Sequence, residues 1–192
     1  MARPNSQLTD DEATFLALLV RVQPATAYQL SKIYADSPIS NFGTSKGKIY
    51  PMIRRLKERG LIGAKMIAGD ARNIEILRST TKGRDALRSW VRQVKPGHLL
   101  PEDPLRTMVQ SFELLSREER LQWIEDVRSG LRFKLAELEE YGATVQVPYK
   151  DQVHDNAVSS IETRLGWLDR LESSVRRAGE VHELAQARAS RG

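Results

Sequence analysis

The segment TSKGKIYPMIRRLKERGLI, residues 44–62, combines six Lys or Arg residues with an apolar stripe. Its apolar positions recur at i, i+3, i+4 and i+7, which places them on one face of a helix. The basic residues largely occupy the other faces, and Gly60 is suited to end the helix. The segment therefore predicts an amphipathic helix with a cationic surface. The residues of its apolar face are Ile49, Met52, Ile53 and Leu56.

Pro51 falls inside this predicted helix. A proline in a helix interior has no N–H to donate and clashes with the carbonyl four residues earlier, at a cost of about 3 kcal/mol. Two arrangements would accommodate it. In the first, regular helix begins only around residues 48–50, so that Pro51 lies in the first turn. In the second, the helix begins at Ser45 and bends, which leaves the Gly47 carbonyl open to water or to another partner. The sequence leaves both arrangements open.

Two helices are predicted upstream of this segment. Thr9 and Glu12 stand in capping-box spacing at the start of an apolar helical pattern over residues 8–22, which Pro24 ends. Thr26 is suited to cap a short second helix. The 44–62 helix is therefore the third of three.

A β-hairpin and a fourth helix are predicted downstream. Residues 61–68 and 73–77 are β-leaning runs separated by a short turn that contains Arg72. Thr80 or Thr81 then begins a helix. The residues predicted to face inward along it are Ala86, Leu87, Trp90, Val91 and Val94. The order helix, helix, helix, hairpin, helix is that of a winged helix-turn-helix, in which the third helix enters the DNA major groove.

Residues 95–104, KPGHLLPEDP, contain three prolines and predict a linker. Beyond it we expect a short helix, then a long helix opened by the capping box of Ser116 and Glu119, and a second long helix from about Asp151. We therefore expect a mainly α chain with a small β-hairpin wing. A winged helix-turn-helix DNA-binding domain is predicted at residues 1–95, and a helical dimerisation region at residues 96–192.

Apolar residues on the two long helices step by three and four, which is typical of a coiled-coil seam. The residues predicted to form a dimer along this coiled-coil-like seam are Leu135, Leu138, Val158, Ile161, Leu165 and Leu168. The alternative is that the same residues close a helical hairpin within one chain.

The two predicted domains differ in charge. Residues 1–95 carry 17 Lys or Arg and 8 Asp or Glu, a net charge of +9, so the remaining residues carry 13 and 17, a net charge of −4. This division indicates that the first domain meets a polyanion and the second meets protein. An uneven scatter of solvated surface charge is the alternative.

Residues 47–62, GKIYPMIRRLKERGLI, resemble the signature Gly-x-(Leu/Ile)-Tyr-Pro-x-(Leu/Ile)-x-Arg-Leu-x-x-x-Gly-Leu-(Ile/Val) of PadR-like transcriptional regulators. The resemblance extends through LTDDEATFLALL, PATAYQL and STTKGRDALRSWV, and covers about residues 8–94. The chain departs from the family pattern where Ala27 replaces a glycine. It also has ILRSTT, residues 76–81, where the family usually has Tyr-x-Leu-Thr, so the register of the wing strands stays open.

The resemblance implies DNA contacts from the third helix and the wing. The residues implied are Ser45, Lys46, Gly47, Lys48, Tyr50, Pro51 and Arg54 in the helix and Arg72 at the wing. We assign Lys48 and Arg54 to base edges and the remaining polar side chains mainly to phosphate. For the other side chains of the helix we favour structural roles: Arg55 and Arg59 pair with acids, and Lys57 is solvated surface. Tyr50 has the alternative of packing under the helix.

The resemblance further implies a homodimeric repressor that binds a double-stranded DNA operator and is released by a small molecule, often a phenolic or other aromatic compound. Trp90, Trp123 and Trp167 are the candidate effector-binding residues. A tryptophan on an apolar helix face more often belongs to the core.

Catalytic and metal-binding signals are absent from the sequence. The chain has no cysteine, no Gly-rich phosphate loop, and neither a GxSxG nor an HExxH motif. His98, His154 and His182 share no metal-ligand spacing. We therefore expect no enzyme, no metal and no cofactor. The acidic run of residues 10–12 is interpreted as helix-dipole chemistry in a first turn.

No apolar run approaches the roughly 18 residues of a membrane span, and the first residues lack the apolar region of a signal peptide. We therefore expect a cytoplasmic protein, in the bacterial cytoplasm and at the nucleoid when bound to DNA, with no membrane partner. The alternative to a DNA-binding regulator is a helical scaffold or protein-interaction module whose basic half binds an acidic protein.

Overall fold

The structure is a computed structural model that describes residues 7–38, 45–67, 74–100, 102–144 and 146–189, with Lys46 and residues 179–189 described by their backbone. The chain divides into two compact units, Met1–Pro101 and Glu102–Gly192. This division falls six residues after the predicted domain boundary, within the predicted linker. None of the helices in the described ranges has an apolar stretch long enough for a bilayer.

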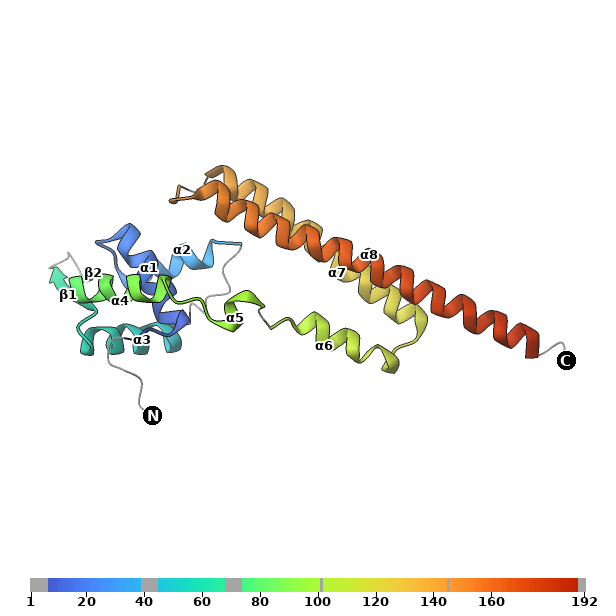
Figure 1. Cartoon of the computed structure of the whole chain (residues 1–192). Helices are drawn as coiled ribbons and strands as arrows, with labels where there is room; N and C mark the ends of the chain where they lie inside the picture. The colour runs from blue at the N-terminus through green and yellow to red at the C-terminus, as the bar shows by residue number, and fades with distance from the viewer. Residues whose placement is uncertain (1–6, 39–44, 68–73, 101, 145, 190–192) are drawn as a thin grey trace, which may run out of the picture. The chain divides into compact units, whose positions relative to one another are not determined.

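The first unit has the element order predicted for a winged helix-turn-helix (Figure 1). Its elements are α1 (Asp10–Val22), α2 (Ala27–Ala35), α3 (Lys46–Glu58), β1 (Ile62–Ile67), β2 (Ile74–Ser79), α4 (Thr81–Val91) and the short α5 (Pro96–Leu99). The capping box predicted for Thr9 and Glu12 is present, and Thr26 is the N-cap of α2 as predicted, where it also forms a capping box with Gln29. Each box satisfies backbone N–H groups that the first helical turn leaves without partners.

The core of this unit lies between α1, α3 and the hairpin. α1 contributes Phe15, Leu16 and Leu19, each with no exposed surface, and β2 contributes Leu77. The predicted apolar face of α3 is buried in the same cluster: Ile49, Met52, Ile53 and Leu56 are at most 3% exposed. Because one side of α3 is fixed in this core, its other side is presented outward in one orientation.

α3 begins at Lys46, so Pro51 lies in the helix interior and not in the first turn. The arrangement with regular helix from 48–50 is therefore wrong. Since proline has no N–H, the Gly47 carbonyl lacks its usual donor from position 51. Gly60 has φ 68°, the left-handed conformation that ends a helix at low cost when the residue is glycine.

The wing strands pair antiparallel with Ile62 opposite Ser79 and Ile67 opposite Ile74. β2 therefore runs two residues further than the predicted end at Leu77. Leu77 also pairs with Ala25 in an isolated bridge, which joins the hairpin to the segment between α1 and α2. The two added residues, Arg78 and Ser79, pair with Gly63 and Ile62 of β1.

α4 begins after its N-cap Thr80 and ends at Val91. The predicted inward positions Ala86, Leu87 and Trp90 do pack against the core. The prediction was wrong for Val91 and Val94, whose exposed fractions are 65% and 69%. The helix stops before the periodic pattern stops, so Val94 no longer lies on the helix face that the pattern assumed.

The second unit contains α6 (Pro104–Gln110), the 3-10 turn η1 (Phe112–Leu114), α7 (Arg117–Thr144) and α8 (Lys150–Ala189). The predicted capping box is present, since Ser116 and Glu119 exchange hydrogen bonds of 2.7 and 3.2 Å. α7 and α8 pack against each other over much of their lengths (Figure 1).

Two sets of contacts hold the second unit together. Its apolar cluster is built on Phe112, Ile124, Leu168 and Val175. Arg128 of α7 also reaches Glu172 of α8 at 2.6 Å and Asp169 at 3.2 Å. These hydrogen bonds raise the pKa of the Arg128 guanidinium.

Candidate nucleic-acid interface

The outward side of α3 carries the side chains predicted to contact DNA. Tyr50 is 53% exposed, so it does not pack under the helix. The side chains of Lys48 and Arg54 are 41% and 76% exposed. These three positions lie on the helix surface left free by the buried face, which is the arrangement a major-groove helix requires.

The first turn of α3 is open. Ser45 is the N-cap residue and is exposed, and its side chain makes no capping hydrogen bond among the described residues. No described atom lies within 4 Å of the Cβ position built at Gly47. The first N–H groups of a helix and its positive dipole end attract anions such as phosphate. Pro51 is half-buried one turn further on.

Two of the exposed cations have acidic partners. Lys48 Nζ lies 3.0 Å from Asp11 Oδ2 at the start of α1. Arg54 Nε lies 3.9 Å from Glu58 Oε1 one turn along the same helix, with both side chains mostly exposed. A surface pair of this second kind contributes about 0.3–0.5 kcal/mol, so it leaves Arg54 available to another acceptor.

Arg55 and Arg59 both reach Glu12 of α1, with side chains that are 55% and 19% exposed. Arg59 Nη1 donates to Glu12 Oε2 at 2.9 Å, and Arg55 Nε lies 3.6 Å from Glu12 Oε1. Glu12 is 3% exposed, and its side chain also accepts from the Thr9 N–H in the capping box. Burial raises the pKa of Glu12, but the Thr9 N–H and the two guanidinium groups outweigh it and leave the pKa below its ordinary value. The structural role predicted for both arginines is therefore present in the structure.

Lys57 lies at the surface, with its side chain 38% exposed, and pairs with Glu75 of β2, so it joins α3 to the wing. On the wing itself, Arg72 lies outside the described residues. The described strands add two exposed cations that the sequence interpretation missed, Lys65 and Arg78. Gly63 is opposite Arg78, and Lys65 lies two residues beyond Gly63 on the same strand. Because residues two apart on a strand point to the same face, Lys65 and Arg78 share one face of the hairpin.

Asp10 joins α1 to the far end of the unit. Its Oδ1 accepts from Lys95 Nζ at 2.7 Å and from Trp90 Nε1 at 2.8 Å, and its Oδ2 lies 3.3 Å from His98 Nε2. The hydrogen bond from Lys95, followed by that from Trp90, lowers the pKa of Asp10 to about 2. The three acids of the first turn therefore do more than complement the helix dipole.

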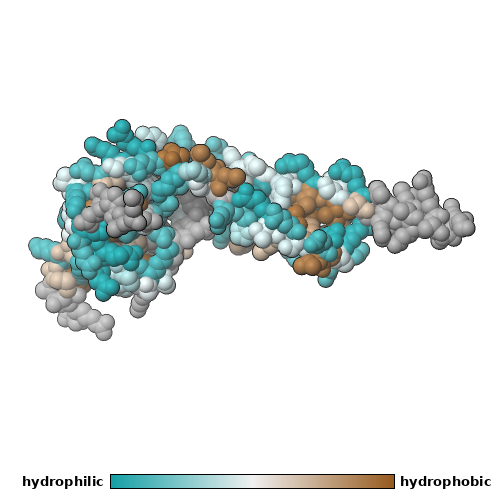
Figure 2. Space-filling view, turned by 60° about the horizontal axis from the view of Figure 1, so that its bottom comes forward, coloured by the Kyte–Doolittle hydropathy of each residue, from teal (hydrophilic) through white to brown (hydrophobic). Residues whose placement is uncertain are grey.

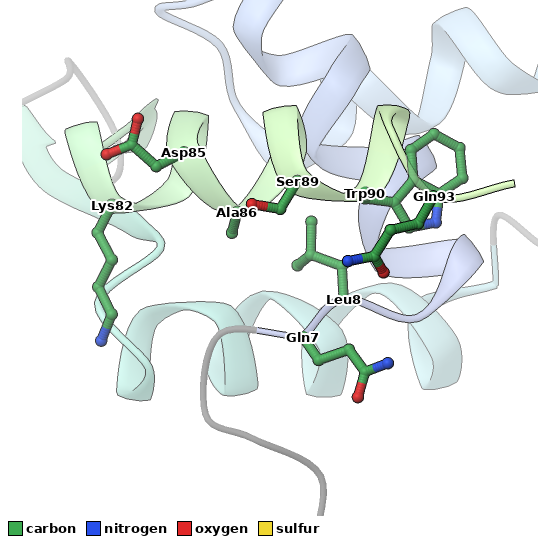
Figure 3. Close-up of a pocket in the computed structure, with 8 residues that line it drawn as sticks. All are labelled: Gln7, Leu8, Lys82, Asp85, Ala86, Ser89, Trp90 and Gln93. Carbon is green, nitrogen blue, oxygen red and sulfur yellow. The ribbon is translucent and has the colours of Figure 1, made fainter.

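The candidate effector residues lie in both units. Trp90 lines a pocket of about 630 Å³ together with Gln7, Leu8 and the side of α4 from Lys82 onward (Figure 3). Trp123 and Trp167 pack against the apolar cluster of the second unit. Trp123 contacts Phe112 edge to face, with the two ring centroids 5.1 Å apart. Trp123 and Trp167 thus have core contacts, while Trp90 has pocket surface.

Half of the predicted dimerisation residues are used within one chain. Leu138, Ile161 and Leu168 are at most 9% exposed in the second unit, and Leu135, Val158 and Leu165 are half-buried. Other apolar side chains remain exposed, notably Phe133 on α7 and Val153 on α8, at 67% and 46%. Figure 2 shows apolar residues gathered in patches on an otherwise hydrophilic face.

The structure is similar to several solved structures. PadR of Bacillus subtilis in complex with operator DNA matches with a TM-score of 0.71 at 20% identity, covering 85% of this chain and 98% of that chain. The same protein in complex with p-coumaric acid matches with a TM-score of 0.68 at 16% identity, covering 86% and 98%. A PadR-like transcriptional regulator from Bacillus cereus matches with a TM-score of 0.66 at 18% identity, covering 88% and 97%.

No protein-family model matches the sequence, and the comparison with curated proteins also finds no match. The similarity is therefore one of three-dimensional structure at low sequence identity, and it extends over both units of the chain. The chain has the winged helix-turn-helix fold with a long carboxy-terminal helical region that is seen in PadR and PadR-like transcriptional regulators.

Proposed function

We propose that this chain is a sequence-specific, double-stranded DNA-binding transcriptional regulator of the PadR type that acts in the bacterial cytoplasm and is not an enzyme. The observation that carries the proposal is the division of α3 into a buried apolar face and an exposed cationic side with an open first turn. The same fold occurs in a regulator solved on its operator.

In this proposal α3 enters the major groove with its first turn against the backbone. Lys48 and Arg54 are the residues for base edges, where Lys and Arg donate to guanine O6 and N7. Phosphate contacts are assigned to Ser45, Lys46, Tyr50 and Arg72, which would fix the register of the protein on the duplex. Gly47 lies in this first turn and Pro51 one turn further on, and neither places a donor-bearing side chain between the backbone and the DNA.

We further propose that the functional form is a homodimer and a repressor. A two-fold dimer reads two half-sites about 34 Å apart or a multiple of that distance. Leu138, Ile161 and Leu168 are already buried in one chain, so the partner would instead cover half-buried residues such as Leu165 and the exposed Phe133.

Release by a small aromatic effector is the remaining part of the proposal. It is supported by the structural similarity to a PadR solved with p-coumaric acid. Trp90 lines a pocket of the first unit and also packs against its core, and Trp123 and Trp167 pack against the core cluster of the second unit.

The proposal is tested by selection of bound sites from a random duplex DNA pool with the full chain. A regulator enriches one sequence, and the spacing of its half-sites reports the dimer directly. A salt titration on the enriched site should then give a slope of log affinity against log salt of about −0.9 per phosphate neutralised. If the selection enriches no DNA sequence and the chain binds acidic proteins, the results would favour the protein-interaction module instead.

A further inference from the structure

The first turn of α1 lies against the recognition helix, and its acidic residues pair with cations along that helix. Asp11 meets Lys48 near the start of α3, and Glu12 meets Arg55 and Arg59 at its end. The Lys48 and Asp11 side chains are 41% and 54% exposed, so the pair stands at the surface where α3 is open. A carboxylate thus lies beside a side chain assigned to base contact.

This carboxylate is held in place by its neighbours on α1. Glu12, the next residue, is 3% exposed and bonded to Arg59 at 2.9 Å, and Thr9 caps the same turn. The backbone that carries Asp11 is therefore anchored to the carboxy-terminal end of α3 through Glu12. Asp11 stays close to Lys48 because of this anchoring, and does not depend on the surface pair alone for its position.

The pairing changes what Lys48 can contribute to binding. Non-specific DNA affinity comes from Lys and Arg side chains that neutralise phosphates and release counterions. A lysine 3.0 Å from a carboxylate adds almost no net charge to the surface. Salt screens this pair weakly, because the separation is well under the Debye length of about 8–10 Å at physiological ionic strength. The same carboxylate repels any phosphate that approaches Lys48.

We propose that Asp11 is a specificity-determining positioning residue: it directs the Lys48 ammonium toward base edges and withholds it from phosphate. The inference rests on the proposed function and adds to it a carboxylate outside the recognition helix. Asp11 lowers the affinity for non-specific DNA more than it lowers the affinity for the operator. It thereby raises the ratio of specific to non-specific binding, which decides how a regulator finds its site among many competitors.

The test compares Asp11→Asn with Asp85→Asn. Asp85 is an exposed carboxylate on α4, so the control changes the net charge of the same unit equally. Affinities for the selected operator and for a scrambled duplex are measured over a range of salt. Asp11→Asn should raise scrambled-duplex affinity about three- to five-fold over the control, as expected for releasing one surface pair. The slope of log affinity against log salt should steepen by about 0.9, one added phosphate contact.

A double variant separates positioning from simple charge removal. In a Lys48→Ala background, Asp11→Asn should behave like Asp85→Asn, because no ammonium remains to be released. Equal effects of Asp11→Asn and Asp85→Asn with Lys48 present would overturn the inference. So would a gain in scrambled-duplex affinity that persists without Lys48. If the wild-type chain selects no duplex at all, the proposed function fails and this inference fails with it, whereas a selected operator with unresponsive variants rejects Asp11 alone.

Discussion

Arg54 and Arg59 of the recognition helix provide a matched pair of substitutions with opposite expected effects. Arg59→Ala removes the close partner of the buried Glu12, and also a 2.8 Å hydrogen bond to the Gln7 carbonyl. Arg54→Ala removes a side chain that is 76% exposed and 3.9 Å from an equally open carboxylate. The first change affects the fold of the unit, and the second affects the surface proposed to meet DNA.

The size of the Arg59→Ala effect follows from the burial of Glu12. Removing one partner of a buried ion pair costs about 3–5 kcal/mol of unfolding free energy. Arg55 remains 3.6 Å from Glu12, and Arg59 itself keeps partial exposure, so we expect about 3 kcal/mol, the low end of this range. For a domain of this size that lowers the melting temperature by roughly 12–24 °C. Arg54→Ala should change stability by about 0.5 kcal/mol or less.

Urea unfolding followed by hydrogen exchange on peptides from α3 reads the first unit separately from the second. Operator binding is measured in parallel at a temperature where both variants are folded. Arg54→Ala should weaken operator binding by about 1–3 kcal/mol, and Arg59→Ala should leave it nearly unchanged. Equal stabilities of the two variants would refute the assignment of Arg59 to the fold. Equal operator affinities would refute the division of α3 into two functional sides.

The ion pair between Glu12 and Arg59 makes the stability of the first unit depend on pH. The pKa of Glu12 is lowered in the folded chain, so its ion pairs stabilise the fold fully above its ordinary pKa of 4.5 and lose that effect as the pH falls below it. The stability difference between wild type and Arg59→Ala should therefore shrink on acidification. A difference that stays constant down to low pH would show that the Glu12 charge does not carry the effect.

Three further predictions address the other surfaces. Lys48→Ala should reduce operator affinity by about 1–3 kcal/mol in a gel-shift titration and leave thermal stability within about 0.5 kcal/mol. Phe133→Asp should dissociate the dimer in sedimentation while the helical circular dichroism is kept, whereas Leu168→Asp, which buries a charge at 0% exposure, should unfold the second unit. Gly83→Ala would place Cβ 2.0 Å from the Leu61 carbonyl oxygen, so the melting temperature should fall markedly; an unchanged melt would contradict this contact.

The parts of the fold that could be predicted are those with local causes. Thr9 with Glu12, and Ser116 with Glu119, are only three residues apart, so the helix starts are visible in the spacing. The apolar stripe of α3 and the stop at Gly60 are likewise local. The position predicted for Val94 is wrong because the periodic pattern extends past a helix end that the sequence does not mark. Val91 is the last residue of the helix and is 65% exposed.

The sequence indicates that Arg55 and Arg59 of α3 pair with acids, but it could not identify Glu12 as their partner, because the two helices are far apart in sequence. Glu12 and Arg59 are separated by 47 positions. The helix dipole already explains why acidic residues occur in the first turn of α1. Nothing in the sequence therefore suggested that the same residues also form ion pairs with distant cations. For the same reason the pattern of Leu138 and Leu168 fits both a dimer and a hairpin within one chain, and only the burial of each residue separates the two uses.

The anchoring of α3 through Glu12 limits how this protein could be retargeted to a new DNA sequence. A recognition helix is often treated as a cassette whose surface is exchanged as a whole. Here Arg55 and Arg59 belong to the scaffold, because they are bound to α1. A library built to change specificity should therefore vary Ser45, Tyr50 and Arg54 and keep both arginines. It should also vary Asp11 together with Lys48, because the two side chains form an ion pair on the surface proposed to meet DNA.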